Sequence, residues 1–176
     1  MTVVKSIFVV LILSLIGLAA FYEDIVSKIL LPQYIEWGYE TEAQGLKLGV
    51  PLDEEGLKLA KDIGVKSPEK IRIVSVDVVP FPYDNFALKV LGESLGFIGE
   101  DIINEAQAFG YSIYVRKGYE LDKPRLAHEI VHVLQIERSN FKDVTFQHLS
   151  DLAKYGYSKA PLEVEAFKAN KKYSGS

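Results

Sequence analysis

The chain has 176 residues, with 20 Lys and Arg against 24 Asp and Glu, three histidines and no cysteine. The absence of cysteine excludes a disulfide scaffold, a thiolate zinc site and a cysteine nucleophile, and the mildly acidic balance argues against a nucleic-acid partner, because proteins that bind nucleic acid usually have a strong basic excess. A chain of this length is expected to form one main domain whose core needs no covalent cross-links.

The first 22 residues differ from the rest, because an uncharged and mostly apolar stretch runs from Ser6 to Tyr22. This layout is typical of a secretory signal peptide, and its length is also close to what spans a bilayer. We slightly favour a retained membrane anchor, because Phe21 and Tyr22 resemble interfacial aromatic residues; a buried core helix is the alternative. Lys5 favours a cytoplasmic N-terminus, so the remaining chain is expected outside the cytoplasm, membrane-anchored or secreted.

Hydrophobic periodicity and turn residues predict the elements that follow. Residues 23–70 are expected to form an N-terminal helical segment and connector, and residues 71–176 the main domain. In chain order the expected elements are a helix over 23–36, a connector to 50, a helix over 53–63 capped by Asp53, a strand over 71–79, a helix over 84–95, a strand over 111–116, and helices over 123–138, 143–155 and 161–171.

The predicted helix over 123–138 contains two of the three histidines, His128 and His132. Positions four apart differ by about 40° around a helix, so both imidazoles point to one place and can bind one ion. Glu129 lies on the same arc, where a carboxylate can accept a proton from a metal-bound water without being a ligand. Since the helix is otherwise strongly apolar and buried polar groups need partners, we interpret this HExxH motif as a metal site rather than a solvated histidine pair.

A catalytic zinc usually has three protein ligands and one open position, so a third ligand must come from elsewhere in the chain. Glu163 and Glu165 are two residues apart in a predicted helix, about 200° around its axis, so only one of them can face the ion. If Ala166 packs on the motif helix, Glu165 beside it is the more natural ligand and Glu163 faces solvent. We therefore favour Glu165, with Glu163 and His148 as alternatives.

The pattern resembles the gluzincin type of zincin metallopeptidase, in which HExxH on one helix is joined by a glutamate from a later helix. More narrowly, three segments are similar to small bacterial zincin-like domains of unassigned function: IYVR (113–116), LAHEIVHVLQ (126–135) and PLEVEAF (161–167). The resemblance implies an α+β, zincin-like fold with a small mixed sheet packed on the HExxH active-site helix, here preceded by an N-terminal hydrophobic helix.

The resemblance also implies roles for particular residues. His128 and His132 map onto the metal-binding pair, Glu129 onto the catalytic base and Glu165 onto the third ligand, with Zn²⁺ as cofactor. An extended substrate would then pair with the strand over 111–116 as a sheet edge; an interior position for that strand is the alternative.

The sequence therefore predicts a zinc-dependent hydrolase, most simply a peptidase acting on a peptide or protein substrate. Tyr155, Tyr157 and His148 are candidate donors to the transition state, and Gln135 could support a ligand or line the cleft. The alternative functions are a catalytically inactive zincin-fold binding module tethered to the membrane, and a membrane protein in which HExxH is accidental. Whether residues 34–55 cover the cleft is left open by the sequence.

Overall fold

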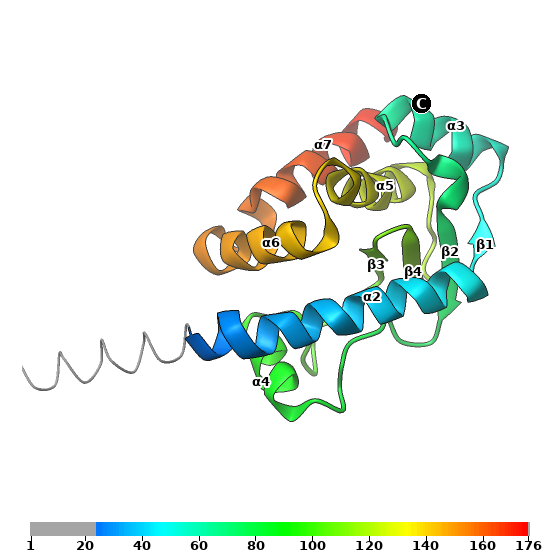
Figure 1. Ribbon diagram of the computed structural model, residues 1–176. Coiled ribbons are helices and arrows are strands. Elements are labelled where there is room, and N and C mark those ends of the chain that lie inside the picture. Colours follow the sequence, from blue (N-terminus) through cyan, green and yellow to red (C-terminus); the bar gives the residue numbers. More distant parts are fainter. Residues whose placement is uncertain (1–23, 176) are drawn as a thin grey trace, which may run out of the picture. The chain divides into compact units, whose positions relative to one another are not determined.

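The computed structural model describes residues 24–175 (Figure 1). The chain divides into two compact units, Met1–Tyr34 and Ile35–Ser176. The predicted signal peptide or anchor, residues 1–22, lies outside the described residues. Within residues 24–175, no helix has the length and apolar character needed to cross a membrane. The described part of the first unit contains a π-helix, Val26–Leu30, and a pair between Lys28 Nζ and Asp24 Oδ2 at 2.8 Å.

The second unit is a mixed α+β fold built on a small four-stranded sheet. The strands lie in the order β1-β2-β4-β3, with β2 and β4 parallel and the other two pairs antiparallel. The elements are α2 (Leu31–Leu48, which begins in the first unit), β1 (Val50–Pro51), α3 (Glu54–Ile63), β2 (Arg72–Val76), α4 (Phe86–Ser94), β3 (Ala106–Phe109), β4 (Ser112–Arg116), α5 (Lys123–Arg138), α6 (Phe141–Tyr155) and α7 (Pro161–Tyr173). The predicted α+β class and the small mixed sheet are thus confirmed.

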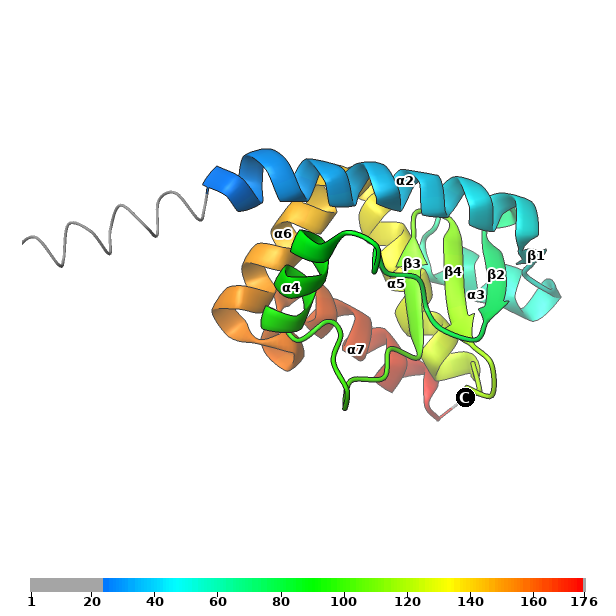
Figure 2. The same ribbon diagram turned by 90° about the horizontal axis from the view of Figure 1, so that it is seen from below.

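The sheet is covered on both faces, by α5 on one side and by α2 on the other (Figures 1 and 2). Successive side chains of β4 point to opposite faces of the sheet, as in any β-strand. Ile113 belongs to the core cluster that also contains residues of α5, whereas the Ser112 and Tyr114 hydroxyls donate to the backbone oxygens of Glu42 and Thr41 on α2, at 2.9 and 2.8 Å. The strand is therefore held from both sides.

The helix α5 has the bounds that the sequence predicts, and its termini follow from local chemistry. The Asp122 side chain accepts from the backbone N–H of Arg125 at 3.1 Å, and Pro124 lies in the first turn, both of which favour a helix start. Its apolar face packs into the main core, and burying each large aliphatic side chain contributes about 1.5–3 kcal/mol. The buried core residues of α5 are Ala127, Ile130, Val133 and Leu134. Packing therefore fixes which way the polar residues of α5 point.

The helix α2 continues to Leu48, so the connector expected after residue 36 is wrong. Gly45 lies inside this helix. A Cβ at Gly45 would collide with the Ser112 side chain. The glycine therefore allows α2 to lie close against β4, and this tertiary requirement outweighs the low helix propensity of glycine.

The strand β4 is interior, so the expectation that residues 111–116 form a sheet edge is wrong. The edge beside it is β3, which the sequence analysis did not predict because its four residues carry no clear alternation. The turn between β3 and β4 contains Gly110 at φ +55°, a conformation that favours glycine. The Glu42 carboxylate accepts from the backbone N–H of Tyr111 at 2.9 Å and ties this turn to α2.

Glu137, at the end of α5, anchors the loop before β2. Its carboxylate accepts from the backbone N–H groups of Lys66 and Ser67 at 2.8 and 3.0 Å and from the Tyr111 hydroxyl at 2.6 Å. Burial alone would raise the pKa of Glu137, but the hydrogen bonds from Lys66, Tyr111 and Ser67 outweigh it, so the net shift is downward. The charged form of the carboxylate therefore stabilises the fold.

The Glu137→Gln variant is expected to lower the free energy of unfolding by about 1–3 kcal/mol near neutral pH. Because the folded-state pKa lies below the unfolded value, this contribution is present above the unfolded pKa and is lost as the pH falls through the folded one. Denaturant unfolding of both proteins across the acid range checks this, with the exposed Glu120→Gln as control. A difference that grows on acidification would contradict the assigned role.

Candidate metal centre

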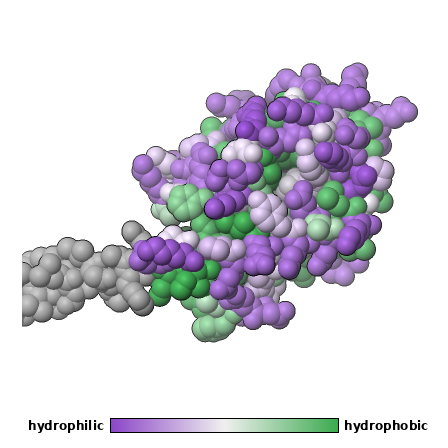
Figure 3. Space-filling view, in the orientation of Figure 1, coloured by the Kyte–Doolittle hydropathy of each residue, from purple (hydrophilic) through white to green (hydrophobic). Residues whose placement is uncertain are grey.

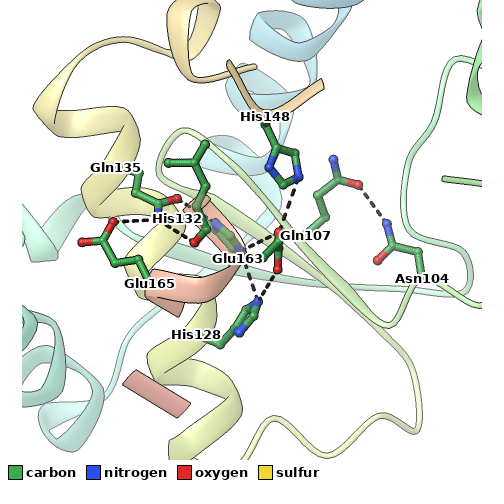
Figure 4. Close-up of polar contacts among 9 residues, drawn as sticks. Asn104, Gln107, His128, His132, Gln135, His148, Glu163 and Glu165 are labelled. Carbon is green, nitrogen blue, oxygen red and sulfur yellow. Dashed lines mark hydrogen bonds and ion pairs between the residues drawn. The ribbon is translucent and has the colours of Figure 1, made fainter. Parts of the chain in front are cut away.

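Three side chains from two helices converge on one point: His128 and His132 of α5 and Glu163 of α7 (Figure 4). The two histidine Nε2 atoms are 3.1 Å apart. Glu163 Oε2 lies 3.4 Å from His128 Nε2, and Glu163 Oε1 lies 3.5 Å from His132 Nε2. The HExxH geometry derived from helical spacing is therefore present, with both imidazoles facing the same place.

These separations suit a shared metal ion. Zinc binds histidine nitrogen and carboxylate oxygen at about 2.0–2.2 Å, which places tetrahedral ligand atoms about 3.4 Å apart. Glu163 Oε2 is buried and has no hydrogen-bond partner, and leaving such an atom unsatisfied costs about 1–3 kcal/mol or more. The residue types, the spacing and the unpartnered oxygen all fit a group that could hold a divalent cation.

The expectation that Glu165 faces the histidines and Glu163 faces solvent is corrected by the structure, since Glu163 is only 2% exposed. Ala166 is fully buried, and α7 packs against α5 as the sequence argument assumed (Figure 1). However, Glu163 lies three residues before Ala166 and so shares its face of the helix, whereas the adjacent Glu165 lies about 100° away. Ala166 therefore packs on α5 as expected, but the carboxylate on the same face of α7 is Glu163 and not Glu165.

Glu165 has partners of its own on the flank of the site. Its Oε2 accepts from Gln135 Nε2 at 3.0 Å and its Oε1 accepts from Arg138 Nη1 at 2.6 Å. Gln135 in turn contacts the Nδ1 atom of His132 through Oε1 at 2.9 Å. Both carboxylate oxygens of Glu165 are therefore engaged away from the point where the histidines meet.

Glu129 lies beside the histidine group but does not belong to it. Burial raises the pKa of its carboxyl to about 7; the charge of His132 opposes this rise and that of Glu163 adds to it. Glu129 Oε2 is buried without a hydrogen-bond partner. For Glu163 the balance is different: burial alone would raise its pKa, but the nearby His128 imidazole, 3.4 Å away, and the charges of the other two histidines together lower it. The two buried carboxyls thus differ, one held as an anion and one poised to exchange a proton near neutral pH.

Two of the three candidate transition-state donors lie at the site. His148 Nε2 is 3.4 Å from Glu163 Oε1, and burial lowers the pKa of this imidazole. The Tyr157 ring packs on Phe167, which packs on His128, with ring centroids 5.9 and 5.0 Å apart. Burial raises the pKa of Tyr157, and the nearby Glu163 charge raises it further. Burial therefore disfavours the charged form of both groups.

Tyr155 is not brought to the histidine group; its ring lies under the Lys154 ammonium, 4.8 Å from ring centroid to Nζ. Asp151 was not among the residues expected near the histidines; it lies one turn after His148 on α6, near enough for its charge to act on that imidazole. The i,i+3 spacing from His148 was the available signal.

Comparisons with protein-family models, with curated proteins and with solved structures found no match, so neither the fold nor the site is assigned to a family.

Proposed function

We propose that this protein is a zinc-dependent hydrolase, most simply a peptidase, in which His128, His132 and Glu163 hold the metal and Glu129 is the general base. The observation that carries the proposal is the convergence of the three ligand atoms, all within 4.8 Å of one another, beside a second buried carboxyl that is not a ligand. A purely structural metal site has no use for that second carboxyl, so Glu129 favours an enzyme over an inactive binding module.

Glu129 is suited to transfer protons in both directions. A general base works best when its pKa lies near the working pH, and burial brings the pKa of Glu129 to about 7. Zinc in such a site supplies Lewis-acid polarisation of a carbonyl and lowers the pKa of water to about 7. Glu129 then accepts the proton of the attacking water and delivers it to the leaving nitrogen.

In this proposal His148 and Tyr157, which lie beside Glu163 and His128, donate to the negative charge that develops on the substrate oxygen. A preorganised donor of this kind typically contributes about 10²–10³ in rate. Because β3 and not β4 is the sheet edge beside α5, we infer that an extended peptide would pair with β3. Residues 1–22 would keep this activity at a membrane or direct it out of the cytoplasm.

The decisive experiment is metal analysis of the full chain, followed by exposure to an unbiased peptide library with products read by mass spectrometry. We expect one zinc per chain, cleavage of internal peptide bonds, loss of cleavage on chelation and its return on adding zinc. Cleavage that persists in the fully chelated protein would contradict the proposal, and so would stoichiometric zinc with no cleavage of any library member.

A further inference from the structure

A chain of four side chains runs from the surface to one of the proposed ligands. Arg138 Nη1 donates to Glu165 Oε1 at 2.6 Å. Gln135 Nε2 donates to Glu165 Oε2 at 3.0 Å, and Gln135 Oε1 lies 2.9 Å from His132 Nδ1 (Figure 4). Gln135 is 4% exposed and its Nε2 also donates to the backbone oxygen of Leu162 at 2.9 Å. Every polar atom of this amide is therefore engaged.

Arg138, at the exposed end of this hydrogen-bond network, sets the donor and acceptor roles of the other members. The Arg138 guanidinium has no acceptor atoms, so it fixes Glu165 as an acceptor. The Gln135 nitrogen faces two acceptors, Glu165 Oε2 and Leu162 O, and this arrangement settles which end of the amide is the NH₂ group. Its oxygen must then face His132, and an oxygen can only accept. His132 Nδ1 therefore carries a proton, and its Nε2 lone pair is left for the shared point.

We propose that Gln135, held by Glu165 and Arg138, is a positioning residue that fixes the tautomer of His132 and binds α7 next to Glu163. The second effect arises because Leu162, whose backbone oxygen Gln135 contacts, directly precedes Glu163. The Gln135 amide thus orients His132 on its own helix and fixes the position of Glu163 on the facing helix. The inference rests on the proposed metal site for its purpose, but the tautomer it requires is a property of the metal-free protein.

The test uses the full chain and two readouts. Long-range ¹H–¹⁵N correlation spectra of the metal-free protein at about pH 8, above the ordinary pKa of a free imidazole, report which nitrogen of His132 carries the proton. Competition with a chelator of known affinity reports zinc binding. We expect the Nδ1–H form in the wild type. In Gln135→Leu we expect a shift toward the Nε2–H form, with zinc affinity falling by about 10–100-fold, as for loss of other outer-shell partners.

A rescue experiment distinguishes the proposed positioning role of Gln135 from a merely structural one. In the double variant Gln135→Glu with Glu165→Gln, the carboxylate at position 135 still accepts from His132 Nδ1–H, and the amide at position 165 donates to it. The carboxylate at position 135 cannot donate to Leu162 O, so we expect the Nδ1–H form to return but only part of the zinc affinity. Arg138→Met removes only the exposed anchor and should give a smaller change in the same direction, while Arg125→Met, on the first turn of the same helix, is the matched control and should change nothing.

An Nε2–H form in the wild type overturns the inference, as does a Gln135→Leu variant with unchanged tautomer and zinc affinity. If Gln135→Leu fails to fold, Arg138→Met decides, and an unchanged tautomer population and affinity in that variant also overturn it. A wild-type protein with the Nδ1–H form that binds no zinc would support the positioning by Gln135 and contradict the proposed hydrolase, so the two failures are distinguishable.

Discussion

The Glu129→Gln variant is expected to bind zinc as tightly as the wild type while its turnover falls by about 10²–10⁴, the usual contribution of a general base. The glutamine is close in size and shape to glutamate but cannot accept the proton of the attacking water. Because Glu129 is buried and outside the ligand group, its loss should leave the site assembled.

The measurement is kcat for a peptide found in the library, together with zinc content and thermal unfolding. The Glu120→Gln variant, at a glutamate whose side chain is 84% exposed, is the control and should match the wild type. Hydrolysis that is unchanged in Glu129→Gln would exclude Glu129 as the base. Loss of zinc together with activity would instead make it a ligand.

The second large effect concerns the third ligand. Glu163→Gln is expected to weaken zinc binding by more than about 100-fold, because loss of an outer-shell partner alone costs about 10–100-fold and Glu163 would be a direct ligand. In Glu165→Gln the amide oxygen can still accept from Arg138 but no longer from Gln135 as well, so the affinity should fall only by the smaller amount of an outer-shell partner.

These two variants form a matched pair, since they make the same chemical change two residues apart on α7. Chelator competition on both, with circular dichroism to confirm the fold, separates the two assignments. If Glu165→Gln loses the metal and Glu163→Gln keeps it, the orientation of α7 described above is wrong and the ligand set must be revised.

Local sequence determined the parts of this protein that depend on neighbours along the chain. The bounds of α5 follow from Asp122, Pro124 and an apolar repeat, and the convergence of His128 and His132 follows from the geometry of one helix turn. The presence of strands among the helices was also predictable, because the alternation in residues 72–76 and 112–116 is distinct from the helical periodicity around it. The small mixed sheet itself was expected only from the resemblance.

Only the tertiary structure decided which acidic residue lies with the two histidines. Glu163 and Glu165 have the same chemistry, and the choice depends on the rotation of α7 about its own axis against α5, which Ala166 and the contact of Gln135 with Leu162 O set. The same holds for the sheet edge. Whether β4 is interior depends on β3, a four-residue strand whose pairing arises from a turn at Gly110 and from Glu42 on α2, far away in the chain. Spacing along a helix can bring two ligands together, but a third ligand from another helix depends on long-range packing that the sequence pattern does not encode.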